Sequence, residues 1–201
     1  MANSHEIISQ PPTGSGLMDA NMVASLHAVI EQAKGSASRD RVFADAGIED
    51  LPVDDGTLSE ARVARLHSLV RENWPGEASE ILDMAGRVAA EVFVSQNITP
   101  KAILLLQNMP WSVSAWLVGK AARLNSAGFR GSGTFAIQTT SRLAIYHNPL
   151  AIGVTADQPI CHFHAAMFEH MFQRMSHRDF VCRETACMAA GHDHCSFELT
   201  L

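Results

Sequence analysis

The sequence predicts one α+β domain, in which a run of helices is followed by strands. Three observations support this class. Apolar residues recur at helical spacing in the first part of the chain, their period then changes to that of strands, and a single helical segment interrupts those strands. With 201 residues, 47% of them hydrophobic and 18% charged, the chain is long enough to bury one sizeable core.

The first helices follow a flexible tail over residues 1–18, and the domain spans residues 19–201. One amphipathic helix runs up to a stop at Gly35, and a short second helix leads into the polar connector "EDLPVDDG". Thr57 and Glu60 fit a capping box, which predicts the start of a third helix. The helical part of the domain therefore begins with three helices.

The helical part continues to residue 128 and contains its most apolar segments. A fourth helix is predicted over residues 77–97, where apolar residues form a wide stripe. Thr99 and Pro100 are typical of an N-cap and a first helical residue. Pro110 separates this fifth helix from a sixth, which is predicted to end near Gly128.

Strands dominate the remaining residues, 129–201. The segment "TFAIQTTSRLAIYHNPL" is rich in β-branched and aromatic residues, whereas "CHFHAAMFEHMFQRMS" returns to helical spacing. Two closing strands are predicted over residues 179–184 and 194–201, joined by a loop. Alternation in the last strand places Cys195, Phe197, Leu199 and Leu201 on its inward side.

Charge and hydropathy exclude two classes of protein. The formal net charge is -6 and the chain has no basic run, which argues against a nucleic-acid-binding surface. The longest apolar run, "AILLL", is far shorter than the roughly 20 residues that span a bilayer as a helix. With no secretory signal visible at the N-terminus, we expect a cytoplasmic protein without a membrane span, although peripheral association stays open.

Three of the four cysteines lie in the closing segment "FVCRETACMAAGHDHCSFELTL". In a reducing compartment, clustered cysteines bind metal or stay as thiols more often than they form disulfides. Zinc takes four ligands from Cys, His and acidic residues. A hairpin would bring Glu184, Cys187 and Cys195 together, and Cys161 would join them from the inserted helix.

Other interpretations of these residues stay open at this point. Four buried thiols without a metal are one alternative, because free cysteine is among the most buried residue types. His192 or His194 could replace Glu184 as a ligand, although both are more simply interpreted as polar turn residues. Cys182 lies on the same side of its strand as Glu184 but further from the turn.

The segment "CRETACMAAGHDHCSFEL" resembles the closing motif of the 4-vinyl reductase (4VR) domain family, and "PICHFHAAMF" matches its upstream cysteine. The match is specific over residues 160–201. The resemblance implies that Cys161, Glu184, Cys187 and Cys195 bind one structural zinc ion and that Cys182 does not. It also implies a fold similar to the small subunits of the TRAPP vesicle-tethering complex, with helices packed on one face of an antiparallel sheet.

The "MPWSVSAW" segment, the length and the lack of a fused domain resemble the stand-alone 4VR proteins of bacteriochlorophyll biosynthesis. The resemblance implies a magnesium tetrapyrrole ligand of the divinyl protochlorophyllide or chlorophyllide type. The chain would support reduction of its vinyl group as a carrier or accessory factor. We expect a homodimer, other pigment-biosynthesis enzymes as partners, and a location at the periphery of the photosynthetic membrane. A small-aromatic sensor domain and an assembly subunit without a ligand are the alternatives.

Catalysis by this chain alone stays uncertain, because the sequence shows no site for a hydride donor. The only glycine-rich stretch, "GFRGSG", follows a helix and precedes a strand, which is the reverse of a dinucleotide-binding motif, so we interpret it as a loop. A zinc ion with four protein ligands has no open position for substrate. No cysteines would then remain for an iron–sulfur cluster.

A flat tetrapyrrole needs an apolar lining, and the residues that we expect to supply it are Trp111, Trp116, His164 and Phe168. The competing interpretation is that these side chains are simply core. Magnesium accepts one axial nitrogen from a neutral imidazole. Candidates for that ligand are His147, His162, His164 and His170.

Overall fold

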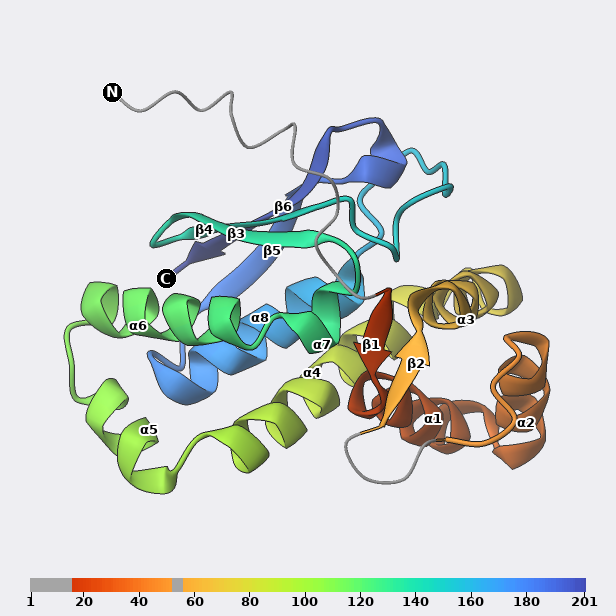
Figure 1. Ribbon diagram of the computed structural model, residues 1–201, viewed down its shortest axis with the longest axis horizontal. Coiled ribbons are helices and arrows are strands. Elements are labelled where there is room, and N and C mark those ends of the chain that lie inside the picture. The colour runs from red at the N-terminus through yellow and green to blue at the C-terminus, as the bar shows by residue number, and fades with distance from the viewer. Residues whose placement is uncertain (1–15, 52–55) are drawn as a thin grey trace.

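The computed structural model describes residues 16–51 and 56–201. Its main feature is a four-stranded antiparallel sheet with helices packed along one face, and further helices behind them (Figure 1). The α+β class and the one-sided packing predicted from the sequence are therefore confirmed. Most of the predicted tail, and residues 52–55 of the polar connector, lie outside the described residues.

The N-terminal part combines helices with a small two-stranded sheet. Its elements are β1 (Leu17–Asp19), α1 (Ala20–Lys34), α2 (Ser36–Asp45), β2 (Thr57–Ser59) and α3 (Glu60–Asn73). Gly35 ends α1 with a φ of 81°, as predicted. β1 pairs antiparallel with β2 and buries Met18 completely. Ordered structure thus begins at β1, within the segment that the sequence assigned to the tail.

The predicted capping box at Thr57 and Glu60 is wrong. Pairing with β1 holds Thr57 in an extended strand, so the N-cap of α3 is Ser59, whose side chain makes no capping hydrogen bond. The Glu60 carboxylate instead accepts hydrogen bonds from the backbone N–H and hydroxyl of Ser132, at 2.6 and 2.8 Å. Tertiary contacts have replaced the local capping pattern.

The central helices are α4 (Ala78–Asn97), α5 (Pro100–Gln107), α6 (Trp111–Leu124) and α7 (Ala127–Arg130). Thr99 caps α5 by accepting a hydrogen bond from the N–H of Ala102 at 3.3 Å, which confirms its predicted role. α6 ends four residues before Gly128, because the Asn125 side chain bonds to the carbonyl of Ala121. α7 then includes the start of "GFRGSG", which the sequence predicted to be a loop. Within the described ranges, no helix combines the length and apolar character needed to cross a bilayer.

The C-terminal part supplies the main sheet. Its elements are β3 (Thr134–Thr139), β4 (Arg142–Tyr146), α8 (His162–Met175), β5 (Val181–Ala186), the 3-10 turn η1 (Met188–Ala190) and β6 (His194–Thr200), and the strand order is β3-β4-β6-β5. Cys195, Phe197 and Leu199 are buried on the inward side of β6, as alternation predicted. Leu201 follows the strand and is 57% exposed, so its predicted inward position is wrong.

The core lies between α4, α8 and the sheet. α8 buries Phe163, Met167, Phe168 and Phe172, and Phe168 makes edge-to-face contacts with Phe129 and Phe197 at 5.6 and 5.1 Å between ring centroids. A methyl group at Gly86 of α4 would overlap the carbonyl oxygen of Phe163 and approach the nitrogen of Met167 to 3.1 Å. The two helices can pack this closely only because Gly86 has no side chain.

We expect Gly86→Ala to destabilise the protein by roughly 1–3 kcal/mol, because the added methyl group would overpack the α4–α8 contact. In an unobstructed helix the same change is stabilising by about 1 kcal/mol. Gly119→Ala is the control, since its added methyl group meets only the flexible Ile137 side chain at 3.3 Å. Chemical denaturation of both variants checks this, and an unchanged free energy of unfolding for Gly86→Ala would contradict the packing argument.

Candidate metal centre

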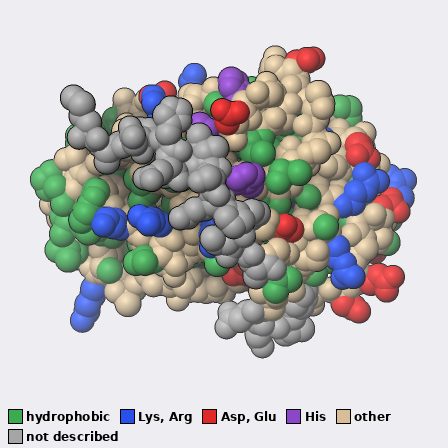
Figure 2. Space-filling model, turned by 45° about the horizontal axis from the view of Figure 1, so that its top comes forward, with side chains coloured by type: hydrophobic (Ala, Val, Ile, Leu, Met, Phe, Trp, Pro, Cys, Tyr) green, Lys and Arg blue, Asp and Glu red, His purple; other side chains and the backbone are tan. Residues whose placement is uncertain are grey.

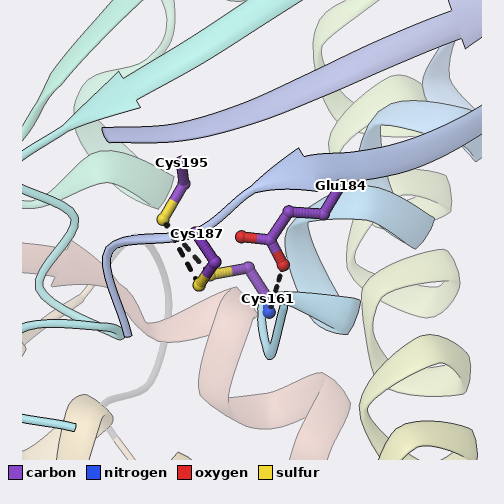
Figure 3. A group of neighbouring side chains, drawn as sticks. All are labelled: Cys161, Glu184, Cys187 and Cys195. Atoms are coloured by element: carbon purple, nitrogen blue, oxygen red, sulfur yellow. Dashed lines mark hydrogen bonds between the residues drawn. The ribbon is translucent and has the colours of Figure 1, made fainter. Parts of the chain in front are cut away.

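Four potential metal ligands converge at one end of the main sheet. Cys161 is the N-cap of α8, Glu184 lies in β5, Cys187 follows that strand, and Cys195 lies in β6. One ligand atom from each lies within 4.8 Å of the others (Figure 3). We call this group the Cys₃Glu cluster, and its members are the four ligands predicted from the sequence.

The three sulfurs are spaced for one shared ion. Cys161 Sγ lies 3.6 Å from Cys195 Sγ and 3.9 Å from Cys187 Sγ, and the third pair is also 3.9 Å apart. These separations are too long for disulfides, and all the thiols are free. Zn–S bonds of about 2.3 Å in tetrahedral geometry would hold sulfurs roughly 3.8 Å apart. The cluster can therefore hold a tetrahedral metal ion.

Glu184 provides the fourth corner. Its Oε2 accepts a hydrogen bond from the Cys161 N–H at 2.7 Å. Its Oε1 is buried and has no hydrogen-bond partner among the described residues, and one carboxylate oxygen points toward the sulfurs in Figure 3. Burial raises the pKa of Glu184 to about 8, and the neighbouring Cys187 sulfur adds to this shift. A bound cation would remove both penalties.

The hairpin between β5 and β6 brings the cluster together. The chain leaves β5 after Ala186 and forms the short η1 turn, and Gly191 adopts a left-handed φ of 87° that suits glycine. The N–H of His192 bonds to the carbonyl of Cys187 at 3.1 Å, which closes the turn. Cys187 and Cys195 thereby face each other, while the start of α8 places Cys161 beside them.

Surrounding groups favour negative charge at the cluster. The Cys187 sulfur accepts hydrogen bonds from the Cys161 and Cys195 thiols, and this lowers its pKa well below the ordinary value. Cys161 lies at the N-terminus of α8, where the helix dipole favours an anion. The Arg71 guanidinium interacts with the Cys161 and Cys187 sulfurs across a largely buried region. Three thiolates and a carboxylate around a divalent ion carry excess negative charge, which these groups offset.

Asn148 is a supporting residue that the sequence did not reveal. Its side chain is fully buried, and its Nδ2 donates to Cys161 Sγ at 3.4 Å and to Cys195 Sγ at 3.5 Å. In the sequence it was interpreted only as half of a turn pair with Pro149. No periodicity or spacing marks it, because it reaches the cluster through the loop after β4.

The alternative ligands do not join the cluster. His194 stacks on Tyr146 at 4.6 Å between ring centroids, and His192 is exposed. Cys182 is buried elsewhere on β5, where its N–H donates to Glu169. The geometry thus selects the four residues implied by the 4VR resemblance.

The structure divides the four predicted pigment-lining residues between two places. His164 and Phe168 are fully buried on α8, with stacked rings 6.1 Å apart. Trp111 and Trp116 lie on α6 and are 46% and 47% exposed. No continuous lining from all four exists in this conformation.

The candidate axial histidines already have protein partners. His164 Nε2 lies 3.0 Å from the carbonyl of Phe129, and its Nδ1 lies 3.5 Å from Asn148 Nδ2. Burial lowers the pKa of His164 to about 4, so it is neutral at pH 7. His170 Nε2 lies 2.8 Å from the Glu91 carboxylate. His162 lines a polar groove with Asp83 and Glu169, and His147 has a φ of 51° in the loop after β4.

The family model of the 4VR domain matches residues 142–201, which contain the whole Cys₃Glu cluster. The chain is 35% identical over 181 residues to the bacteriochlorophyll synthase 23 kDa chain of Cereibacter sphaeroides, covering 89% of this chain and 88% of that protein. It is 29% identical over 182 residues to the protein of the same name from Rhodobacter capsulatus, covering 89% and 84%.

Solved structures of similar fold include H-NOX proteins. An H-NOX protein from S. oneidensis in the Fe(II)NO ligation state superposes with a TM-score of 0.57 at 12% identity, covering 92% of this chain and 99% of that one. A structure from work on haem distortion in the H-NOX family gives a TM-score of 0.56 at 11% identity, covering 92% and 95%. At this identity the likeness concerns the fold.

We expect the purified protein to contain one zinc ion per chain. Cys187→Ser and Cys195→Ser should each lose the metal and lower the free energy of unfolding, because binding of a structural metal contributes directly to folding. Cys182→Ser is the matched control, since it removes a buried thiol outside the cluster, and it should retain the metal. Elemental analysis and thermal unfolding check both points, and full metal content in Cys195→Ser would contradict the ligand assignment.

Asn148→Ala should weaken metal binding roughly 10–100-fold, the usual effect of losing a group that orients metal ligands. Asn148→Asp should weaken it further, because a carboxylate would then face the thiolates. Competition with a chromophoric chelator measures the affinity. Asn125→Ala, which removes an asparagine that caps α6, should leave the affinity unchanged; an equal loss there would mean that the effect is not specific to the cluster.

Proposed function

The chain belongs to the family of the bacteriochlorophyll synthase 23 kDa chain (BchJ), and on this basis we propose that it acts in bacteriochlorophyll biosynthesis by binding a magnesium tetrapyrrole. The ligand is an intermediate of the divinyl protochlorophyllide or chlorophyllide type. The chain supports reduction of its vinyl group by presenting the pigment to a catalyst. The observation that carries this proposal is 35% identity along nearly the full length of both chains.

The metal in this proposal is a structural zinc ion. Three sulfurs and one carboxylate fill a tetrahedral shell, so no position is open for a substrate oxygen or nitrogen. The ion would join α8 to the β5–β6 hairpin and hold that end of the sheet together. The pigment then binds elsewhere on the chain.

Two features support a tetrapyrrole ligand. The fold is similar to that of H-NOX proteins, and haem distortion has been studied in that family; this is an analogy between folds. The chain also offers Trp111 and Trp116 at the surface, where a flat apolar ring can stack without any rearrangement. Reaching Phe168 would require α6 to move away from α8. We therefore place the first pigment contact at the two tryptophans.

The glycine-rich stretch supports a carrier rather than a reductase acting alone. In "GFRGSG" the N–H and hydroxyl of Ser132 both donate to the Glu60 carboxylate. The Arg130 side chain bonds to the carbonyls of Gly131 and Gly133. A phosphate cradle needs free backbone N–H groups and free cations, and here the protein's own carboxylate takes that place.

Adding magnesium divinyl protoporphyrin or protochlorophyllide to the protein should shift and sharpen the Soret band and raise the melting temperature. Titration by absorbance gives the affinity. An unchanged pigment spectrum, together with stabilisation by a small phenol, would instead favour the sensor alternative. Absence of any effect from either compound would favour an assembly subunit.

The tryptophan variants test where the pigment binds. Each of Trp111→Ala and Trp116→Ala should weaken pigment binding by about 3–10-fold, as expected for the loss of one aromatic stacking contact. Trp74→Ala is the control, because Trp74 lies at the end of α3 beside Lys34 and away from α6. Equal affinities for all three variants would contradict the α6 location.

Purified protein with NADPH and a divinyl pigment should give no monovinyl product. Adding an extract that contains the other pigment-biosynthesis enzymes should restore the reaction, and this protein should accelerate it. Product analysis by chromatography decides. Monovinyl product from the pure chain alone would show that it is itself the reductase.

A further inference from the structure

The outward side of α5 and α6 is unusually apolar. We call it the α5–α6 face, and its exposed apolar residues are Leu104, Leu105, Trp111, Val113, Trp116 and Leu124. Among the described residues, 11 large hydrophobic side chains are exposed, and these are six of them. Apolar exposure on this protein is therefore concentrated on two consecutive helices, which is typical of an interaction surface.

Helical geometry shows that this exposure is not an extension of the core. α6 packs inward through small residues, including Ala115, Gly119 and Ala122. Val113, Trp116 and Lys120 lie on the opposite side of the helix, because positions three and four apart share one face. α5 has no fully buried residue, although it contains the longest apolar run of the chain. Most surface helices place polar residues where α6 places Val113 and Trp116.

Charge on this part of the chain is opposite to that of the whole. Residues 92–156 contain none of the 21 acidic residues but five of the 15 Lys and Arg, in a chain of net charge -6. Lys101, Lys120 and Arg123 are exposed on α5 and α6, and none of the three forms an ion pair with a described carboxylate. Lys120 Nζ instead lies over the Trp116 ring, 5.0 Å from its centroid.

The same segregation is visible on the molecular surface. In Figure 2 hydrophobic and basic side chains lie together at the left end of the molecule, where Figure 1 places α5 and α6. Acidic side chains gather toward the opposite end. The α5–α6 face thus combines apolar surface with positive charge in one region.

We propose that the α5–α6 face docks on an anionic lipid bilayer. Leu104, Leu105 and Trp116 would enter the interface between headgroups and acyl chains, while Lys101, Lys120 and Arg123 contact lipid phosphates. Tryptophan favours this interface because its ring is apolar and its N–H is polar. The arrangement gives peripheral attachment, with the remaining acidic surface directed away from the lipid.

The positive charge decides between a bilayer and a second copy of the chain. A two-fold symmetric dimer through this face would place the same patch on both partners and so bring Lys120 and Arg123 near their own copies. Such like charges repel across an apolar contact, whereas anionic lipid neutralises them. The proposal is independent of pigment binding and is tested without pigment.

Vesicle co-sedimentation of the full, pigment-free chain tests this docking. The protein should sediment with vesicles of equal parts phosphatidylglycerol and phosphatidylcholine, and much less with phosphatidylcholine alone. High salt should release it, because it screens the attraction to lipid phosphates. Tryptophan emission should shift to the blue on binding. No sedimentation with anionic vesicles overturns the proposal.

Two double variants separate the apolar and basic contributions. Leu104→Glu/Leu105→Glu and Lys120→Glu/Arg123→Glu should each weaken vesicle binding at least tenfold. Met84→Glu is the apolar control, since Met84 is 52% exposed on α4 beside Glu77 and Glu80. Arg65→Glu/Arg178→Glu is the charge-matched control on exposed cations elsewhere. Both controls should bind like the unchanged chain, and equal weakening of controls and variants would overturn the proposal.

Two further measurements keep the outcomes distinct. Metal content and melting temperature establish that each variant is folded. Sedimentation velocity without lipid detects self-association, and a dimer that Leu104→Glu/Leu105→Glu dissociates, without vesicle binding by the unchanged chain, would assign this face to a second copy. Retained vesicle binding with no Soret shift would leave the docking intact and refute the proposed pigment binding.

Discussion

A buried concentration of negative charge constrains the C-terminal part of this protein. Three cysteine sulfurs and one carboxylate meet with ligand atoms within 4.8 Å of one another, and an uncompensated charge of this kind cannot be buried without a large penalty. The N-terminus of α8, the Asn148 amide and Arg71 all surround the cluster with positive potential. A cation at the centre completes that compensation. It also explains why two strands and a helix converge at one point.

The packing of α8 follows from this junction. With its N-terminus held at the cluster, α8 runs along the sheet and buries an aromatic row against Phe129 and Phe197. Gly86 lets α4 pack closely on the opposite side. α6 contributes only small side chains to this core, so its larger side chains face outward. The exposed tryptophans are therefore a consequence of how the core is filled.

These features together favour binding over catalysis. A metal ion with four protein ligands stabilises the fold but offers no reactive position, and the glycine-rich loop is occupied by Glu60. The surface that remains is apolar and basic. Such a surface suits a protein that handles a hydrophobic pigment next to a membrane, where partner enzymes and lipid can both be reached.

The sequence by itself determined the features that depend on short-range patterns. The α+β class, the helix starts at Thr99 and Pro100, the inward position of Cys195 and the four members of the cluster all follow from periodicity, spacing or a local motif. These features depend on residues close in the chain, whose geometry is fixed by the backbone of one helix or hairpin.

Only the tertiary structure decided the rest. The capping box at Thr57 gave way to pairing between β1 and β2, two strands separated by two helices. Asn148 reached the sulfurs through a loop that no pattern distinguishes. Trp111 and Trp116 have the composition of core residues, yet the small residues of α6 occupy the inward face and leave them exposed. Each outcome depends on contacts between distant segments, which local preferences in the sequence do not encode.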